Sequence, residues 1–336
     1  MTLLQPFAAL PQLLATPAGG IPSPKARMVT SFEEALSARH PGVRVESVEV
    51  EARAEVTNNH LWLRVRYAEA AGAPEQLFCK RLPEEAARRA AIAATGMGLR
   101  EARFYDALAP RLRFRVPRCH ASRFDEASGA FVLLLEDLKH SGCTVSTGPE
   151  SVPPDAAAAA LEDLAELHVR FEDPARRAAE ASFVSPPDPP SDYGKVRLTQ
   201  ALAQNREALS DAFAEASQLY VDRAAVLHGL WAAGPKTVIH GDAHIGNLFF
   251  DHGRTGFLDW GMIVVSTPLR DVSYFLQMTL SVEDRRRDER RLLRHYLDAR
   301  RALGGSVLDP EAAFTTYRIQ AAYLAPASCQ VVTLPP

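Results

Sequence analysis

Long apolar runs and paired cysteines are both scarce in this chain of 336 residues. No apolar run approaches the roughly 20 residues that a helix needs to span a bilayer, so no membrane segment is expected. The apolar opening lacks a basic region and contains Pro6 and Pro11, which argues against a signal peptide. The four cysteines form no CxxC pair and no metal-ligand spacing, which favours a reducing, cytoplasmic location.

An excess of charge of one sign is also lacking. The formal net charge is -3, from 38 basic and 41 acidic side chains, so no electrostatic argument favours nucleic acid or an anionic membrane surface. The charged fraction of 24% and the hydrophobic fraction of 47% are ordinary for a globular protein. The length allows two domains or one domain with two lobes. Nothing in the composition indicates an obligate protein partner.

The most informative stretch is residues 238–250, VIHGDAHIGNLFF, with its echo at 256–260, GFLDW. Apolar residues precede and follow a polar loop, and a second short apolar run ends on another acid. This pattern predicts a strand, a loop, a strand, a turn at 251–254, and a strand ending on Asp259. Loops held between strands often carry catalytic residues.

The spacing His240-x-Asp242-x4-Asn247 matches a kinase catalytic loop, in which the acid receives the substrate hydroxyl proton and the amide holds a metal ion. Asp259 stands where a kinase keeps its main magnesium-binding aspartate. Phosphoryl transfer depends on positioning and on neutralisation of phosphate charge by hard cations with oxygen ligands. The pattern therefore predicts Asp242 as the catalytic residue, with Asn247 and Asp259 as metal ligands.

Two other interpretations concern the histidines of this loop. His240 and His244 have the i, i+4 spacing that binds zinc from one helix face. Gly241 and Gly246 argue against a helix here, and no third ligand cluster is visible. Alternatively, both histidines brace the loop by hydrogen bonding, which we favour for His244.

The motif HGDxHxGN followed by LDW at this interval resembles the aminoglycoside phosphotransferase and choline kinase superfamily, especially its ecdysteroid-kinase-like branch and related bacterial phosphotransferases. The resemblance covers about 43–323 and is strongest over 238–276. It implies an α+β, two-lobed protein-kinase-like fold, with a small antiparallel β lobe and a larger, mostly helical lobe. It also implies transfer of the γ-phosphoryl group of ATP, with Mg²⁺, to the hydroxyl of a small-molecule alcohol.

The predicted elements divide the chain into three parts. Residues 1–30, rich in Pro, Ala and Gly, are expected to form an N-terminal arm. Residues 31–137 are expected to form the small nucleotide-binding lobe, which begins with a short helix capped by Ser31. Residues 138–336 are expected to form the helical catalytic and substrate-binding lobe.

Alternation of apolar and polar residues predicts three antiparallel strands, at 43–50, 61–67 and 77–82. Lys80 lies on the third strand, and Glu101 follows on a helix predicted over 99–108. The resemblance makes these two residues the lysine–glutamate ion pair that holds nucleotide phosphates in kinases. The alternatives are an exposed edge lysine and a surface glutamate beside Arg103.

The strand predicted at 131–138 ends on two acids. In the resembled family it runs into the hinge, so the backbone from Glu136 to Leu138 is expected to contact the adenine ring. The loop at 53–59 contains no glycine and cannot form the glycine-rich phosphate cradle of protein kinases. The remaining polar candidates for the phosphates in this loop are Thr57, Asn58 and Asn59.

Helices dominate the expected second lobe. Asp155 caps a helix whose apolar face includes His168, which is expected to be a core histidine. One long amphipathic helix is expected from Leu198 to about Leu230. Asp271 follows at the start of a further helix, where it either braces the catalytic loop, as the resemblance implies, or interacts with the helix dipole.

Two alternatives to a small-molecule kinase stay open. A catalytically silent nucleotide- or ligand-binding module is suggested by the glycine-free loop and the abrupt end of the chain, although Asp242, Asn247 and Asp259 are intact. A protein kinase would require a glycine loop and an activation segment between Asp259 and Asp271. No acidic cluster suited to aminoglycosides stands out, which favours an apolar, sterol-like alcohol by elimination.

Overall fold

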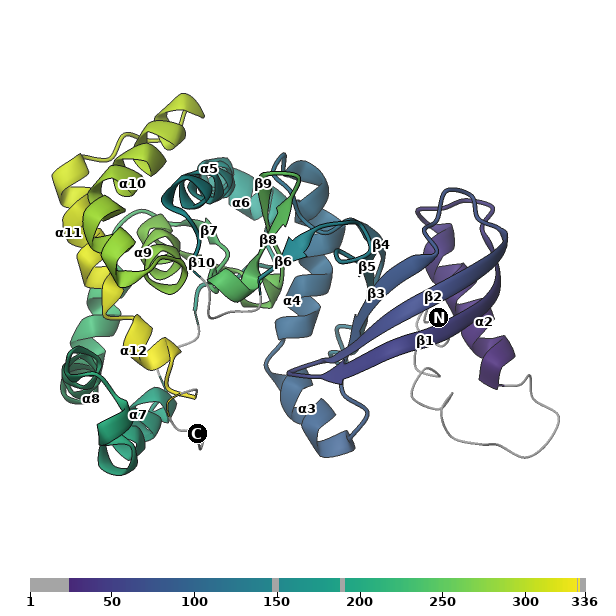
Figure 1. The fold of residues 1–336 in the computed structure, drawn as a ribbon, viewed down its shortest axis with the longest axis horizontal. Helices are drawn as coiled ribbons and strands as arrows, with labels where there is room; N and C mark the ends of the chain where they lie inside the picture. Colours follow the sequence, from purple (N-terminus) through teal and green to yellow (C-terminus); the bar gives the residue numbers. More distant parts are fainter. Residues whose placement is uncertain (1–23, 147–150, 188–190, 331, 333–336) are drawn as a thin grey trace. The chain divides into compact units, whose positions relative to one another are not determined.

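The computed structural model describes residues 24–146, 151–187, 191–330 and 332, and these form two compact units (Figure 1). The first unit runs up to Val145 and also takes in Phe249–Met262. The second unit consists of Ser146–Leu248 and the residues from Ile263 onward. The segment 238–260 is therefore shared, because its loop belongs to the second unit and its last strand to the first.

An antiparallel sheet in the order β1-β2-β3-β5-β4 forms the framework of the first unit. Its strands are β1 (Arg44–Glu55), β2 (Asn59–Glu69), β3 (Gln76–Arg81), β4 (Cys119–Phe124) and β5 (Phe131–Glu136). Alternation along β2 buries Leu61 and Leu63 against α2 (Pro24–Ser37) and places His60 and Trp62 on the other face. One face of β2 therefore packs in the core of the unit, and the other face is left outside that core.

Short helices and a small second sheet complete the first unit. The helices are α3 (Ala86–Ala94) and α4 (Met97–Arg103), and the strands are β6 (Thr144–Val145), β8 (Leu248–Asp251) and β9 (Arg254–Phe257). A π-helical turn, Phe104–Leu108, continues α4. The 3₁₀ turn Trp260–Met262 follows β9 and packs against α4. The predicted turn between β8 and β9 is confirmed, with positive φ at His252 and Gly253.

The second unit is mostly helical. Its helices are α5 (Pro154–Arg170), α6 (Pro174–Glu180), α7 (Tyr193–Gln204), α8 (Asp211–Trp231), α9 (Pro268–Thr279), α10 (Val282–Ala302), α11 (Pro310–Ala321) and α12 (Leu324–Ala327). Two short strands, β7 (Thr237–Ile239) and β10 (Val264–Ser266), pair antiparallel. Helices α5 and α9 both pack on β7, so the strand that leads into the loop at 240–247 is held by two helices.

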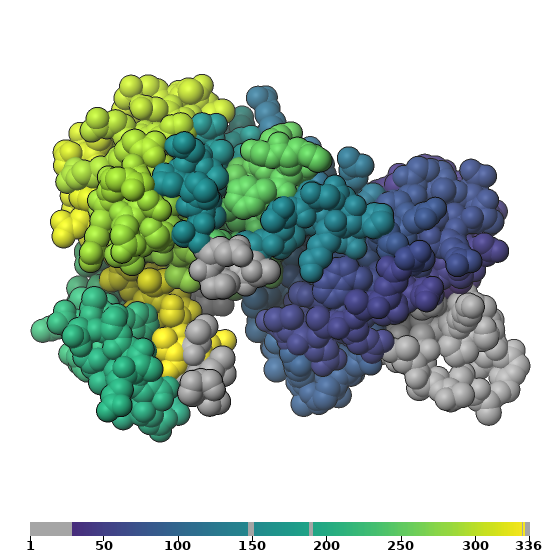
Figure 2. Space-filling model, in the orientation of Figure 1, coloured from purple at the N-terminus to yellow at the C-terminus, as the bar shows by residue number. Residues whose placement is uncertain are grey.

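Further helices of the second unit pack in two groups. Figure 2 shows the yellow-green surface of α10 beside the teal surface of α5, and these helices pack closely along their length. A separate apolar cluster joins α7, α8 and α12 through Leu198, Tyr220 and Trp231. No helix among the described residues is long and apolar enough to cross a membrane.

Three sequence expectations about helices are wrong. Asp155 does not cap α5, which begins at Pro154 after Pro153 and has no side-chain cap. The helix predicted to begin at Ser31 begins at Pro24, because proline with its fixed φ is well suited to the first helical position. Part of the expected arm therefore belongs to α2, and residues 1–23 lie outside the described residues. The single long helix from Leu198 is two helices, because Ser210 accepts the Phe213 N–H at 3.3 Å and starts α8 afresh.

Candidate active site

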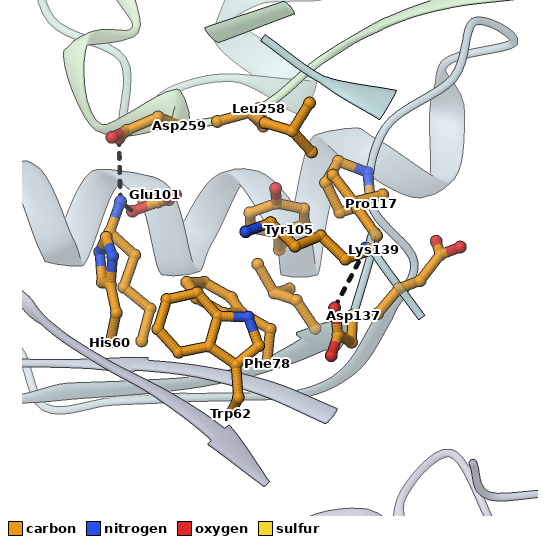
Figure 3. A pocket seen from close by; sticks show the side chains of 15 residues that line it. His60, Trp62, Phe78, Glu101, Tyr105, Pro117, Asp137, Lys139, Leu258 and Asp259 are labelled. Carbon is orange, nitrogen blue, oxygen red and sulfur yellow. Dashed lines mark hydrogen bonds and ion pairs between the residues drawn. The ribbon is translucent and has the colours of Figure 1, made fainter. Parts of the chain in front are cut away.

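Three charged side chains meet inside the first unit. The Lys80 Nζ atom lies 2.7 Å from Glu101 Oε2 and 2.9 Å from Asp259 Oδ1 (Figure 3). The Lys80 and Glu101 side chains are 5% and 2% exposed, whereas that of Asp259 is 40% exposed. The lysine is therefore buried, and the alternatives of an edge lysine and a surface glutamate are wrong. Asp259 joins the pair and keeps an accessible carboxylate.

The backbone around Asp259 is unusual. Asp259 has φ +60°, in the left-handed region that non-glycine residues seldom occupy and that often marks functional sites. The next residue, Trp260, is fully buried and stacks on Phe104 with ring centroids 3.9 Å apart. Gly261 O also accepts a hydrogen bond from Arg100 Nε at 3.1 Å. These contacts fix the segment on α4 and so aim the Asp259 carboxylate at Lys80.

Electrostatics keep the cation in place. Burial by itself would lower the pKa of Lys80, but the carboxylates of Glu101 and Asp259 outweigh it and raise that pKa. Burial raises the pKa of Glu101 to about 7, against the opposing effect of Lys80. Burial, followed by the charge of Lys80, lowers the pKa of His60 to about 4. At neutral pH the pocket therefore presents one buried cation beside an uncharged imidazole.

A pocket of about 210 Å³ opens beside this ion pair (Figure 3). Trp62 and Phe78 form part of its wall and pack edge to face, with ring centroids 5.3 Å apart. The other lining residues are His60, Lys80, Glu101, Tyr105, Pro117, Leu135, Glu136, Asp137, Leu138, Lys139, Val145, Leu258 and Asp259. A flat aromatic and aliphatic wall that ends at a buried lysine suits a ligand with a planar ring at one end and negative charge at the other.

The structure places both hinge residues predicted from the sequence, Glu136 and Leu138, on the pocket wall. The Glu136 carboxylate itself is held elsewhere. It binds Arg115 Nη2 at 2.7 and 2.9 Å and accepts the Arg118 N–H at 3.0 Å. Burial would raise the pKa of Glu136, but these hydrogen bonds lower it. The side chain therefore fixes the end of β5 to Arg115 and to the backbone of Arg118.

The predicted phosphate-contacting residues do not line this pocket. Thr57 is exposed, and Asn59 is buried on the face of β2 that also carries Leu61. His60, one position further along, takes the pocket face instead. Sequence reasoning missed His60, although the alternation along this strand would have separated it from Asn59.

A buried hydroxyl supports a polar ligand in the pocket. Tyr105 lines the pocket, and its hydroxyl oxygen is buried without a hydrogen-bond partner among the described residues (Figure 3). Tyr105 belongs to the π-helical turn after α4, a local distortion that is frequent at functional sites. A buried, unpaired hydroxyl is costly unless a ligand or water satisfies it.

The catalytic loop predicted from the sequence lies in the second unit. Gly241 has φ +83°, which explains a glycine between His240 and Asp242. The Asp271 carboxylate accepts the His240 N–H at 2.6 Å and the Gly241 N–H at 2.9 Å. Burial would raise the pKa of Asp271, but its bonds to His168 and to this loop lower it. Asp271 thus braces the loop, as the resemblance implies.

His168 supports this brace from behind. It is fully buried, as expected of a core histidine, and its Nε2 atom lies 3.3 Å from Asp271 Oδ2. Its Nδ1 atom lies 2.8 Å from the Tyr296 hydroxyl. Burial lowers the pKa of His168, so the ring acts as a neutral hydrogen-bonding group. The brace therefore runs from α10 through α5 to the loop.

Two side chains hold the Asp242 carboxylate. The Tyr274 hydroxyl donates to Asp242 Oδ1 at 3.2 Å. Asn247 Nδ2 donates to the Asp242 backbone oxygen at 2.9 Å and to Oδ2 at 3.3 Å. Because the amide nitrogen of Asn247 is engaged in this way, its amide oxygen is the atom left for a metal ion. The sequence analysis did not identify Tyr274. The only signal for it was its position on the same helix, three residues after Asp271.

The histidines of the loop make local hydrogen bonds. His240 Nδ1 accepts the Asp242 N–H at 3.3 Å, and His244 Nδ1 accepts the Gly246 N–H at 3.0 Å. The second bond is the bracing role expected for His244. Neither residue lies on an α-helix, and no group of three or more potential metal-binding side chains occurs in the described parts of the chain. This geometry gives no support to the zinc interpretation.

The fold and these two sets of residues define a kinase-like phosphotransferase. A model of the phosphotransferase enzyme family matches residues 43–305, and the chain belongs to this family. The structure is similar to wild-type aminoglycoside 2'-phosphotransferase-IIIa in complex with GDP, with 13% identity over 90% of this chain and 92% of that one and a TM-score of 0.52. It is also similar to choline kinase from Cryptosporidium parvum Iowa II, with 10% identity over 85% and 83% of the two chains and a TM-score of 0.51.

No curated protein matches the sequence of this chain. At such low identities, the two solved structures bear on the fold alone. Together with the family match, they confirm the α+β, protein-kinase-like fold and the expected superfamily. The family match also confirms that the chain is a phosphotransferase enzyme.

Proposed function

We propose that this protein transfers the γ-phosphoryl group of ATP to a hydroxyl of a small molecule and requires Mg²⁺. The observation that carries the proposal is the buried Lys80–Glu101 pair, joined to Asp259 beside an aromatic pocket. An ammonium group fixed by two carboxylates is a ready partner for phosphate oxygens. The similar aminoglycoside phosphotransferase binds GDP, which supports a purine nucleotide as ligand.

Each end of the pocket has a proposed task. The base would lie against Trp62 and Phe78, with the backbone from Glu136 to Leu138 at its edge. Lys80 would bind the phosphates, and Glu101 would hold Lys80 in position. Burying the base against these rings stabilises the complex through apolar contact, while the ion pair selects the phosphate end.

Asp259 and Asn247 are the proposed ligands of Mg²⁺. Both offer oxygen atoms, which this ion prefers, and it usually takes one or two protein carboxylates together with substrate phosphates. Taken singly, each donor suits the ion, because Asp259 has an accessible carboxylate and Asn247 has an amide oxygen. When bound, Mg²⁺ neutralises charge on the phosphate oxygens.

Asp242 is the proposed general base. Its carboxylate is held by Tyr274 and Asn247, yet the side chain remains 33% exposed, so an acceptor hydroxyl can reach it. Asp242 would orient this hydroxyl and accept its proton as the oxygen attacks the phosphorus atom. The proposed acceptor is a small molecule. The proposed location is the reducing cytoplasm, where ATP is abundant, because the four cysteines are free and buried.

Thermal unfolding of wild type and Asp259→Ala with Mg·ATP tests the proposal. A ligand at 100 times its Kd stabilises the fold by about 2.7 kcal/mol, which raises the melting temperature by several degrees. We expect a large shift with ATP and Mg²⁺ together and a smaller shift with ATP alone. In Asp259→Ala the increment from Mg²⁺ should vanish.

Asp106→Ala is the matched control, because it removes an exposed carboxylate from the same unit. It should keep the full magnesium increment. No shift of the wild type at millimolar Mg·ATP would refute the kinase proposal. Equal shifts with and without Mg²⁺, together with no ADP formation, would favour a silent binding module and make Asp259 a structural residue.

A further inference from the structure

Arg270 lies in the first turn of α9. It is about half-buried, its Nε atom is fully buried without a hydrogen-bond partner, and it has no ion pair with any described residue. Arg170, Arg197 and Arg300 also have a buried Nε atom without a partner, but each has another nitrogen that is bonded, that of Arg197 to the Gln200 amide oxygen at 3.5 Å. Arg300 binds Glu172 at 2.6 Å, Arg170 binds Glu180 at 2.7 Å, and Arg177 donates to three backbone carbonyls. A half-buried guanidinium without an anion is uncommon because its desolvation is not offset.

Packing fixes this side chain in one place. The Arg270 guanidinium lies over the ring of Tyr323, with its carbon atom 3.7 Å from the ring centroid. This cation–π contact restricts the side chain, although it supplies no hydrogen-bond acceptor. A planar group stacked in this way keeps donors at its edge that match a carboxylate or phosphate.

The position of Arg270 relates it to the catalytic loop. Arg270 and Tyr274 are four residues apart on α9 and therefore lie on the same helix face. Tyr274 donates its hydroxyl to Asp242, and its ring also packs against Tyr323, with centroids 6.4 Å apart. Tyr323 thus contacts both residues. The unpaired cation consequently lies one helical turn from the side chain that holds the proposed general base.

We propose that Arg270 binds an anionic group on the acceptor, so that the substrate is a hydroxy compound bearing a carboxylate or phosphate ester. This inference rests on the proposed function, because it assigns the acceptor hydroxyl to Asp242. Neighbouring side chains on one helix face are about 5–6 Å apart, so the hydroxyl and the anion are separated by several bonds. An uncharged, sterol-like alcohol, favoured from the sequence alone, would leave Arg270 unpaired.

Matched pairs of acceptors provide the test. The panel contains ω-hydroxy carboxylic acids of increasing chain length, their primary amides, and the corresponding hydroxyalkyl phosphates. Each amide keeps the hydroxyl and the size of its acid but lacks the charge. Transfer of phosphate from Mg·ATP is measured for wild type, Arg270→Met, Arg270→Lys and Arg318→Met. The last variant is the control, since it removes an exposed arginine from α11 without affecting the stack on Tyr323.

The wild type should prefer an acid or phosphate over the uncharged partner by about 10- to 100-fold in kcat/KM, mainly through KM, as expected for a charge-assisted hydrogen bond. Arg270→Met should abolish the preference, and Arg318→Met should keep it. Arg270→Lys should retain only part, because it supplies a point charge without the planar fork. The better of the two anion classes identifies the natural group.

Several results would overturn the inference. They are equal use of acid and amide by the wild type, a preference for the amide, or an unchanged preference in Arg270→Met. If no compound accepts phosphate, the acids and phosphates must still raise the melting temperature more than the amides do, or the inference fails. A normal melting shift with Mg·ATP shows that Arg270→Met is folded; if it is not, the wild-type comparison and Arg270→Lys decide. If Mg·ATP causes neither a shift nor ADP release in the wild type, the proposed function fails, while the anion-dependent shift still tests Arg270.

Discussion

Replacing Tyr274 by phenylalanine removes one hydroxyl that donates to the Asp242 carboxylate at 3.2 Å. Burial, and then the charge of Asp242, raise the pKa of Tyr274 well above its usual range, so the hydroxyl remains a donor at every practical pH. The ring of phenylalanine fills the same space and leaves no buried polar atom behind. The substitution therefore isolates the hydrogen bond.

The magnitude follows from the geometry. A hydrogen bond to a charged group contributes about 1.5–3 kcal/mol. The bond here is long and the Asp242 side chain is 33% exposed, so the lower end applies. A loss of about 1.4 kcal/mol corresponds to a factor of ten.

The assay is ADP release from Mg·ATP as a function of pH, without acceptor and with the best acceptor found. We expect kcat to fall by roughly ten-fold near neutral pH and the KM for ATP to stay the same, since the proposed nucleotide pocket is lined by residues of the other unit. Tyr317→Phe is the matched control. Its hydroxyl donates to Glu289 at 3.1 Å, in the same unit, without touching Asp242.

A purely structural role for Tyr274 would lower the melting temperature of Tyr274→Phe and leave the kcat of the folded variant unchanged. The reasoning is refuted if the kcat of folded Tyr274→Phe coincides with those of the wild type and Tyr317→Phe.

Two further predictions concern activity and acid stability. Asp242→Asn should reduce turnover by a factor of about 100 or more with little change in ATP affinity by calorimetry, since general-base contributions reach 10²–10⁴; full activity would exclude Asp242 from catalysis. The second prediction concerns His120. Burial, and then the neighbouring His40 ring, whose Nε2 atom lies 3.0 Å from His120 Nδ1, lower the pKa of His120 to about 4. The folded state therefore favours the neutral ring, and the stability that this gives above pH 6.5 is lost as the pH falls toward 4. His120→Gln should therefore lose about 2 kcal/mol less free energy of unfolding than the wild type between about pH 7 and pH 4.5, measured by urea titration. Parallel losses in both proteins would contradict this assignment.

Local patterns in the sequence predicted much of the catalytic framework. The turn between β8 and β9 follows from the residues at 251–254, and the spacing of Asp242 and Asn247 indicated a shared loop. These features depend on backbone preferences and on contacts between residues close in the chain, which a single sequence displays directly. The Lys80–Glu101 pair could be predicted only from the family resemblance, because the alternation of apolar and polar residues does not show which helix packs against which strand.

Strand β4 shows where pattern reasoning fails. It was not predicted, because His120, Ser122 and Arg123 interrupt the apolar character expected of a buried edge strand. Its place in the sheet comes from pairing with β5 and from the Ser122 hydroxyl, which donates to Ala102 O at 2.8 Å. These polar groups are acceptable in the interior only because tertiary contacts satisfy them.

The sequence by itself indicated the strand–loop–strand segment and, through the resemblance it carries, the class of fold, while the roles of its acids and amide stay predictions. Only the tertiary structure decided that Asp259 joins Lys80, that Tyr274 holds Asp242, and that Arg270 has no anionic partner among the described residues. The physical reason is the range of the interactions. Turns and periodicity are encoded over a few neighbouring residues, whereas a buried ion pair or an unpaired cation depends on segments that are distant in sequence and adjacent only after packing.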